Sequence, residues 1–414
     1  MARWDAAAAA SVDVVKVDGV IDPAQAAYVR GSIERSKRVG ATVILQVDSR
    51  GGYGDEGVRL GRFIRSAAVP VVSWVGPSGA RAAGGALFLL YGSSLAAMAP
   101  GAGIGPARPF DLDTSASRED PGPVATRSAT LLALAPGSGA SAEAVRSIVN
   151  GRVMAAAAAR DAGAVALVAE DVPSLLRALD GRTVHTMRGP VVLATANRPD
   201  RPVTVRFHEI GLTRRVLHAV GTPGAVYVLL VLGLWGLAFE LTQPGFGMAG
   251  IAGVVFLVFA GYGLSVVPVN WLGLALIVAG AGLQGLDVVL RRVQALTLGG
   301  TALFAFGSAL AWWTVAPAVR LAPWLIVVAS VGGLLFFGFG MTVALRARER
   351  IRTTQVGLVG LVGETRSDLN PEGGVLVKGA LWRARSMDGP IPKGRRVRVR
   401  GVDSLILRVE QEPD

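Results

Sequence analysis

Two glycine-rich stretches in the first third of the chain contain residue types that suit an oxyanion hole. Residues 48–52 are Asp-Ser-Arg-Gly-Gly and follow the pattern of a buried strand, and residues 77–86 contain a second glycine pair. Glycines let backbone N–H groups approach a ligand closely, which an oxyanion hole requires. On its own, the first stretch is typical of an ordinary strand-to-helix turn. The prediction of an oxyanion hole therefore depends on the second stretch. The predicted site, whose amides could hold a peptide backbone, consists of Gly51, Gly52, Gly84 and Gly85.

The side chains near these stretches offer hydroxyl groups but no general base. The serines that could replace a lost nucleophile are Ser78, Ser93 and Ser94. A serine hydroxyl is a weak nucleophile without an adjacent base. Arg81 and Arg127 are the nearby cations, but arginine stays protonated and cannot accept the proton. Lysine is absent from residues 39–377, so a lysine base is excluded throughout this region.

Thiol and metal chemistry have no basis in the sequence. There are no cysteines, which excludes disulfides, thiolate metal sites and a cysteine nucleophile. The three histidines are scattered without metal-ligand spacing, and each is predicted to be a surface or core residue: His185, His208 and His218. We therefore expect no metal and no cofactor.

The elements that must position the glycine stretches alternate between strands and helices. Residues 42–47 and 71–75 are short apolar runs rich in β-branched residues, typical of strands buried on both faces. Asp22 can cap a helix that starts at the following proline, and another helix is predicted over residues 80–91. Residues 111–123 are charged and proline-rich, which predicts a mobile surface loop. This order predicts an α/β domain with a mostly parallel sheet.

Residues 223–345 form a run of apolar segments separated by short polar joints. Each segment is near the ~20 residues that a helix needs to cross a hydrocarbon core, and in lipid only a helix satisfies its own backbone at this length. Five spans are predicted, over residues 225–241, 248–267, 271–290, 296–314 and 323–345. Glu240 ends the first span, where it is either a functional residue or a cap at the membrane interface.

The soluble segments on either side complete a multidomain architecture: α/β, membrane α-helical and all-β. Residues 207–217 are amphipathic and basic, which predicts a helix along the membrane surface. Five short alternating runs near the C-terminus predict a small closed barrel of the OB type. The predicted parts are residues 1–200 (α/β domain), 201–222 (amphipathic lead-in), 223–345 (membrane helices), 346–356 (basic linker) and 357–414 (barrel).

The net charge of +12 comes almost wholly from arginine and fits contact with an anionic lipid bilayer. No motif with interleaved aromatic residues indicates a nucleic-acid partner. Short-loop arginines are more numerous on the C-terminal side of five spans, which predicts a cytoplasmic C-terminal domain and an extracytoplasmic N-terminal domain at the plasma membrane. The apolar run near Met1 is too short for a signal peptide, which leaves export of the first domain open.

Three further sequence motifs occur along the chain. Residues 98–107 are Met-Ala-Pro-Gly-Ala-Gly-Ile-Gly-Pro-Ala, residues 239–247 are Phe-Glu-Leu-Thr-Gln-Pro-Gly-Phe-Gly, and residues 391–394 are Ile-Pro-Lys-Gly. With residues 48–52, they resemble matching elements of the membrane-bound NfeD family. The resemblance implies a ClpP/crotonase-like N-terminal domain, about five transmembrane helices and an OB-fold C-terminal domain.

Such family members are serine peptidases with a Ser–Lys dyad, and the resemblance places both dyad positions on residues without the required chemistry. The serine belongs in a Gly-Ala-x-Ala-Ala-Ser-x-Gly-like segment, where the matching residue here is Gly84. The lysine position falls on Leu132. The resemblance therefore implies a degenerate peptidase, in which the fold and groove remain and the catalytic residues are lost.

Two functions follow as alternatives. The first is a scaffold protein in membrane organisation or quality control, whose groove holds a hydrophobic peptide by strand addition. The resemblance implies that its partner is a stomatin/flotillin-type membrane protein, and that the protein assembles as a homo-oligomer. The second is an active membrane-bound serine endopeptidase with a non-standard nucleophile, such as Ser78 or Ser93.

Overall fold

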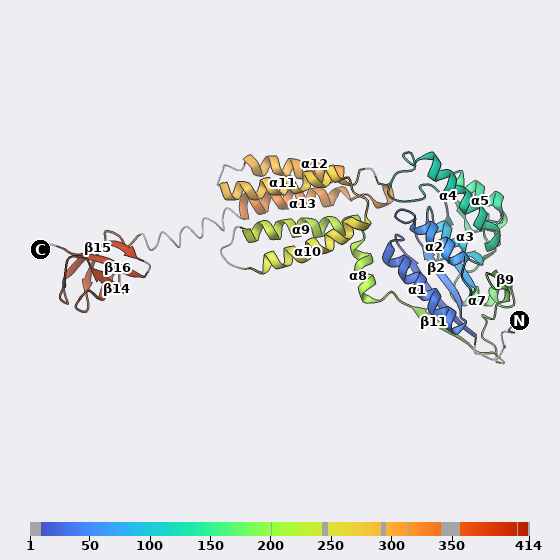
Figure 1. Ribbon diagram of the computed structural model, residues 1–414, viewed down its shortest axis with the longest axis horizontal. Coiled ribbons are helices and arrows are strands. Elements are labelled where there is room, and N and C mark those ends of the chain that lie inside the picture. Colours follow the sequence, from blue (N-terminus) through green and yellow to red (C-terminus); the bar gives the residue numbers. More distant parts are fainter. Residues whose placement is uncertain are drawn as a thin grey trace. The chain divides into compact units, whose positions relative to one another are not determined.

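The computed structural model describes residues 10–199, 201–241, 247–290, 295–313, 315–340, 357–403 and 405–412. The chain divides into two units (Figure 1). The first comprises residues 1–286 and 298–331, and contains the α/β domain with most of the apolar helices. The second comprises residues 287–297 and 332–414, and contains the barrel.

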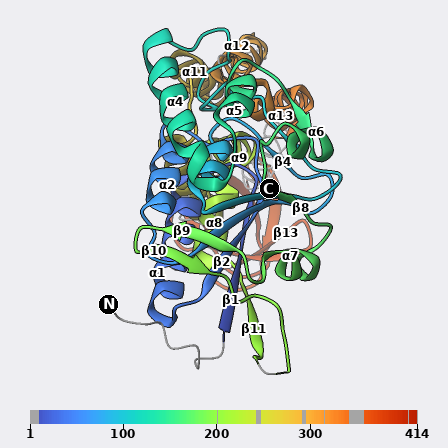
Figure 2. The same ribbon diagram turned by 90° about the vertical axis from the view of Figure 1, so that its right-hand side faces the viewer.

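The α/β domain is built on six parallel strands in the order β11-β1-β2-β3-β5-β8. In Figure 2, α1 and α2 lie on one side of these strands and α7 on the other. This confirms the predicted α/β architecture. The strands are β1 Ala10–Asp18, β2 Thr42–Asp48, β3 Val71–Val75, β5 Leu95–Met98, β8 Leu167–Val168 and β11 Val203–His208. The smaller sheets are β4 Arg81–Ala82 with β6 Gly103–Ile104 and β7 Met154–Ala155, and β9 Thr183–Thr186 with β10 Gly189–Val192.

The helices of this domain begin where the sequence supplies caps. Asp22 Oδ1 accepts a hydrogen bond from Gln25 N at 2.7 Å, and proline follows at the first helical position of α1. Gly40, with a φ of 67°, ends the same helix. The helices are α1 Pro23–Val39, α2 Glu56–Arg65, α3 Ala86–Gly92, α4 Pro121–Leu134, α5 Ala142–Val149, α6 Ala156–Asp161, α7 Val172–Leu179 and α8 Leu212–Val220.

The helix predicted over residues 80–91 is wrong in its first half. Arg81–Ala82 forms strand β4, because its backbone pairs with β6. It also bridges to the preceding glycine turn, where Ser49 N donates to Arg81 O at 2.7 Å and Ala83 N donates to Ser49 O at 3.1 Å. The left-handed Gly84 then separates this strand from helix α3. Tertiary pairing therefore outweighs the helical propensity of this alanine-rich segment.

The amphipathic lead-in also differs from a single surface helix. Val203–His208 forms β11 and pairs with β1 in the main sheet, so Phe207 lies in a strand. Helix α8 begins only at Leu212. His218 Nδ1, in its last turn, lies 2.8 Å from Asp22 Oδ2 and joins α8 to the start of α1.

Five apolar helices follow: α9 Pro223–Leu241, α10 Met248–Val266, α11 Trp271–Leu290, α12 Ala295–Ala311 and α13 Pro323–Leu335, which a π-helical turn extends to Gly340. Four of these segments are long and apolar enough to span a membrane, and α12, with 17 residues, is shorter. The ends of the predicted fourth and fifth spans lie outside the described residues. The chain is therefore an integral membrane protein, as predicted.

Glycines bring these helices together in pairs. A Cβ atom added at Gly253 on α10 would lie 3.0 Å from Gly233 O on α9, and one at Gly280 on α11 would lie 2.7 Å from Gly300 O on α12. Such close backbone approach requires small residues. The small residues in the predicted spans therefore serve helix packing.

Two acidic residues at helix ends accept hydrogen bonds from the start of the next helix. Glu240 accepts from Gly247 N and Gly250 N, so the interface-level cap is the interpretation that the contacts support. Asp287, near the end of α11, has a side chain only 3% exposed, and its Oδ2 accepts from Thr297 N at 3.0 Å. Both carboxylates thus satisfy orphan amides at a helix N-terminus.

The C-terminal barrel is closed in the order β12-β13-β14-β16-β15, as the alternating runs predict. Its core is formed by inward-facing residues such as Val375, Val397 and Leu407, each fully buried. Strands β14 and β16 run parallel, and all other neighbours are antiparallel. The strands are β12 Val362–Thr365, β13 Glu372–Val377, β14 Ala380–Ser386, β15 Arg396–Asp403 and β16 Ile406–Gln411.

Candidate functional site

The two glycine stretches lie against each other. A Cβ atom added at Gly51 would lie 3.5 Å from Gly85 N, and one at Gly84 would lie 3.3 Å from Arg50 O. Gly51, Gly52, Gly84 and Gly85 are therefore neighbours at the carboxyl end of β2 and the start of α3.

Two of these four amides are already engaged within the protein. Gly51 N donates to Ser49 Oγ at 3.3 Å, and Gly84 N donates to Pro106 O at 3.0 Å. Gly52 bridges in parallel to Asp111, and its carbonyl accepts from Leu112 N at 2.9 Å. The place where an added peptide strand would pair is taken by the protein's own chain.

Gly84 cannot carry a side chain in this conformation. Its φ is +52°, in the left-handed region that favours glycine. A Cβ atom here would lie 2.5 Å from Pro109 O, and backbone atoms do not yield as a flexible side chain does. Gly84, which the resemblance places at the nucleophile position, therefore has neither a hydroxyl group nor space for one.

Leu132 lies in the last turn of α4, which ends at Leu134 and is followed by a short 3-10 helix. Its side chain is half-buried and packs on the apolar core beside the fully buried Leu131. An aliphatic side chain in this position cannot accept or donate a proton.

Residues 108–113, which we name the cover segment, lie over the glycines. Glu119 holds the start of this segment: its side chain is 2% exposed, it accepts from Phe110 N at 2.8 Å, and it pairs with Arg108 Nε at 2.9 Å. Asp113 Oδ1 accepts from Gly54 N at 3.1 Å. The expected mobile surface loop is thus wrong for this part, because buried hydrogen bonds fasten it to the domain.

Arg127 of α4 joins the cover segment to α2. Its Nη1 lies 2.5 Å from Asp111 Oδ2, and its Nη2 lies 2.8 Å from Asp55 Oδ1. Burial tends to lower the pKa of Arg127, but the two carboxylates outweigh burial and raise it. Burial, aided by the charge of Asp111, raises the pKa of Asp113. Arg127 is therefore a clamp, and its proton is held more firmly than in water.

None of the hydroxyl groups of the substitute serines is hydrogen-bonded to a basic side chain among the described residues. Ser93 is fully buried, and its hydroxyl contacts Leu90 O at 2.6 Å and Leu95 O at 2.9 Å. Ser78 is exposed and Ser94 half-buried. The hydroxyl of Ser93 is thus used in capping a helix end, away from any base.

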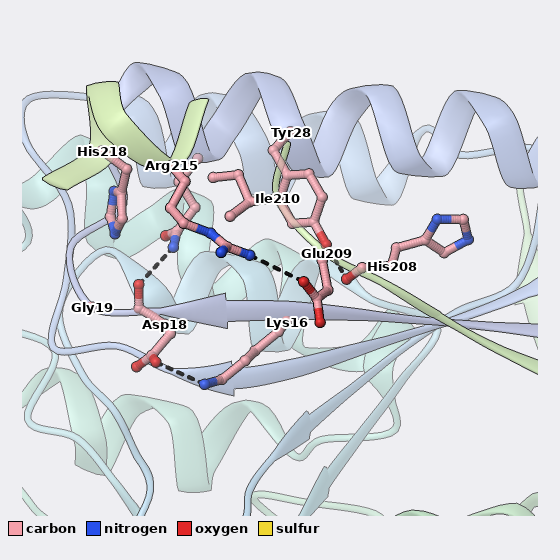
Figure 3. Close-up of a pocket in the computed structure, with 10 residues that line it drawn as sticks. Lys16, Asp18, Gly19, Tyr28, His208, Glu209, Ile210, Arg215 and His218 are labelled. Atoms are coloured by element: carbon pink, nitrogen blue, oxygen red, sulfur yellow. Dashed lines mark hydrogen bonds and ion pairs between the residues drawn. The ribbon is translucent and has the colours of Figure 1, made fainter. Parts of the chain in front are cut away.

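The three histidines lie apart from the glycines. His218 and His208 line a cavity of about 590 Å³ beside β1 and α1, and His185 lies on β9 (Figure 3). Figure 3 shows the charged groups of this cavity turned toward one another: Lys16 lies 2.9 Å from Asp18, and Arg215 lies 3.0 Å from Glu209. No cluster of three metal-ligating residues occurs within the described ranges.

Sequence patterns did not identify the residues that close the cleft. Asp55, Asp111 and Glu119 lie in loops or at helix starts without periodicity. The sequence contains one signal of these contacts: residues 111–120 are rich in acidic side chains, and Arg127 is a cation on a nearby apolar helix.

Two family models match the chain. The NfeD integral membrane domain matches residues 225–342, and the NfeD-like C-terminal, partner-binding domain matches residues 356–411. A membrane-bound protease of Pyrococcus horikoshii is 30% identical over 384 residues, covering 89% of this chain and 86% of the relative.

Solved structures match the two soluble parts. A lysine-to-alanine variant of the 1510-N membrane-bound stomatin-specific protease, in complex with a substrate peptide, is 25% identical, covers 51% of this chain and 98% of its own, and has a TM-score of 0.47. The C-terminal domain of a stomatin operon partner protein of Pyrococcus horikoshii is 44% identical over 14% of this chain and 95% of its own, with a TM-score of 0.14.

Proposed function

Because the chain belongs to the NfeD family, we propose that it is a membrane scaffold protein with a ClpP-like domain that has lost peptidase activity. The observation that carries this proposal is the geometry at Gly84. A left-handed backbone and a carbonyl oxygen 2.5 Å from any Cβ leave no place for a nucleophile. The absence of lysine from residues 39–377 removes the family's base as well.

The test for lost activity is labelling of the purified full chain in detergent with a fluorophosphonate, together with incubation with hydrophobic peptides. We expect neither labelling nor cleavage, while the Pyrococcus horikoshii protease, as positive control, shows both. Cleavage that disappears in Ser78→Ala or Ser93→Ala would overturn the proposal. That result would establish the alternative, an endopeptidase with a non-standard nucleophile, which the name of the relative favours.

The proposed scaffold function places partner binding on the C-terminal barrel. The family model for this region describes a partner-binding domain, and a relative's matching domain is named a stomatin operon partner protein. We propose a stomatin/flotillin-type membrane protein as the partner, in membrane organisation or quality control. Leu381 near the start of β14 is 68% exposed and offers an apolar contact on the barrel surface.

Binding of the full chain to a stomatin-type protein from the same genome tests this partnership. We expect co-purification from detergent, and weaker binding for Leu381→Glu than for the control Met387→Glu at the other end of β14. If the wild-type chain does not bind, the partner is assigned wrongly. Light scattering on the same samples tests the proposed homo-oligomer. A hydrophobic peptide reaches the cleft only when the cover segment moves.

A further inference from the structure

A cavity of about 380 Å³ lies over Gly84, between the cover segment and the loop that joins α12 to α13. Its basic lining consists of Arg50, Arg81 and Arg108, and it has no acidic lining residue. Its apolar lining includes Leu112, Ala316 and Pro317. The mouth of the former catalytic cleft has thus become a pocket with a basic half and an apolar half.

Two of the three arginines carry charges without a carboxylate partner. Arg108 is compensated by Glu119 at 2.9 Å. Arg50 and Arg81 are exposed, and neither has an ion pair within 4 Å among the residues that the structure describes. Asp18 and Asp48 line a second cavity, which shares Arg50, Arg81 and Leu112 with this one.

The apolar half of the cavity lies at the end of the membrane helices. Leu112 O accepts from Ala316 N at 3.2 Å, and Leu112 packs in the same apolar cluster as α9 to α12. Pro317–Val319 forms a short turn between the end of α12 and the start of α13. The cavity therefore opens where the soluble domain meets the bundle.

Exposed tryptophans place this end of the bundle at the membrane interface. Trp271, Trp313 and Trp324 are 69%, 61% and 63% exposed. Asn270 N donates to Ala311 O at 2.8 Å, so the starts of α11 and the end of α12 lie side by side. Tryptophan is enriched at the level of lipid headgroups, and Arg320 lies over the Trp313 ring at 5.7 Å.

We propose that this cavity binds an anionic phospholipid. The guanidinium groups of Arg50 and Arg81 donate to the phosphate, for which arginine has matching bidentate geometry. The glycerol and first acyl carbons lie along Leu112, Ala316 and Pro317. A headgroup with net negative charge is favoured over choline, because the two uncompensated arginines repel a quaternary ammonium group.

The test is native mass spectrometry of the detergent-solubilised full chain titrated with phosphatidylglycerol or phosphatidylcholine. We expect phosphatidylglycerol to bind at least tenfold more tightly to the wild type than to Arg50→Gln/Arg81→Gln, since each charge-assisted hydrogen bond accounts for about a tenfold change. The matched control is Arg146→Gln/Arg160→Gln on α5 and α6, which removes two exposed positive charges elsewhere.

The outcomes separate the site from general charge attraction. Equal loss in both double variants, or equal affinity for the two lipids, would overturn the proposal. Glycerol phosphate, which lacks acyl chains, is expected to bind more weakly than phosphatidylglycerol. If it binds as tightly as the lipid, the apolar half of the cavity has no role and the lipid assignment is wrong. The fold is expected to survive, because Arg81 contacts Asp48 through its backbone N and not through its side chain. The single variants Arg50→Gln and Arg81→Gln provide a second test, because each is expected to lose part of the affinity for phosphatidylglycerol.

Discussion

At Gly84 the backbone conformation and a neighbouring atom exclude a side chain independently. The left-handed φ would penalise any L-residue, and Pro109 O occupies the direction of the Cβ atom. Introduction of a serine at Gly84 is therefore expected to disturb the backbone around it.

We predict that Gly84→Ser destabilises the protein and restores no activity. The left-handed conformation alone costs about 1–2 kcal/mol for a residue with a Cβ atom, and displacement of the cover segment adds to this. Thermal unfolding and fluorophosphonate labelling measure the two effects. The control is Gly122→Ser, where a Cβ atom meets nothing within 4 Å. Unchanged stability of Gly84→Ser would contradict the geometry.

His218 is the residue whose protonation affects the junction before the membrane. Its hydrogen bond to Asp22 raises the pKa of His218 above the ordinary 6.5, against the lowering effect of burial. A raised pKa in the folded state means that the pair stabilises the protein fully below the unfolded pKa. This stabilisation is lost as pH rises through the folded pKa.

We predict that thermal stability of the full chain decreases above pH 6.5 by more in the wild type than in His218→Gln. Glutamine keeps a polar group near Asp22 but does not titrate. Unfolding temperatures between pH 5.5 and 8.5 provide the measurement. If the unfolding temperatures of the two proteins change in parallel with pH, the His218–Asp22 pair does not contribute to stability.

At the scale of elements, the cover segment is fastened by residues from three different parts of the chain. Gly52 O accepts from Leu112 N, Glu119 accepts from Phe110 N, and Arg127 holds Asp111. The cleft is closed because several elements converge on this one segment.

We predict that Arg127→Ala loosens the cover segment. The change leaves Asp111, whose side chain is 10% exposed, without its cation, at a cost of about 1–3 kcal/mol. Hydrogen exchange at the amides of Phe110 and Leu112 is expected to accelerate. Arg146→Ala on α5 is the control and is expected to leave both amides protected. Equal protection in Arg127→Ala would show that the clamp is not needed.

For the whole molecule, the number of membrane crossings decides whether the two soluble domains share one side of the membrane. Four helices are long enough to span a membrane, and α12, with 17 residues, decides the count. If all five helices cross, we expect the two soluble domains on opposite sides of the membrane, and the arginine bias predicts a cytoplasmic C-terminal domain.

We predict opposite labelling of the two domains. The chain has no cysteine, so Arg146→Cys and Arg366→Cys each supply a unique thiol. In intact cells an impermeant maleimide is expected to label the first, and to label the second only after permeabilisation. Labelling of both thiols in intact cells would mean that α12 does not cross.

Local patterns were sufficient for the elements whose stability is local. The sequence predicts the caps of α1, the apolar length of α9 to α13 and the alternation of the barrel strands. Each of these features depends on residues that are neighbours in the sequence. The assignment of the two dyad positions to Gly84 and Leu132 depends on residue identity and stays a prediction from the resemblance.

Only the tertiary structure decided what became of the cleft. Residues 81–82 form a strand because they pair with β6 and bridge to Ser49, and β11 joins β1 from the far end of the domain. The contacts of Asp111, Glu119 and Arg127, and the juxtaposition of Arg50 and Arg81 with Ala316, join segments with no shared periodicity. Such long-range contacts leave no repeat in the sequence, because they depend on how the sheet and the bundle bring distant loops together.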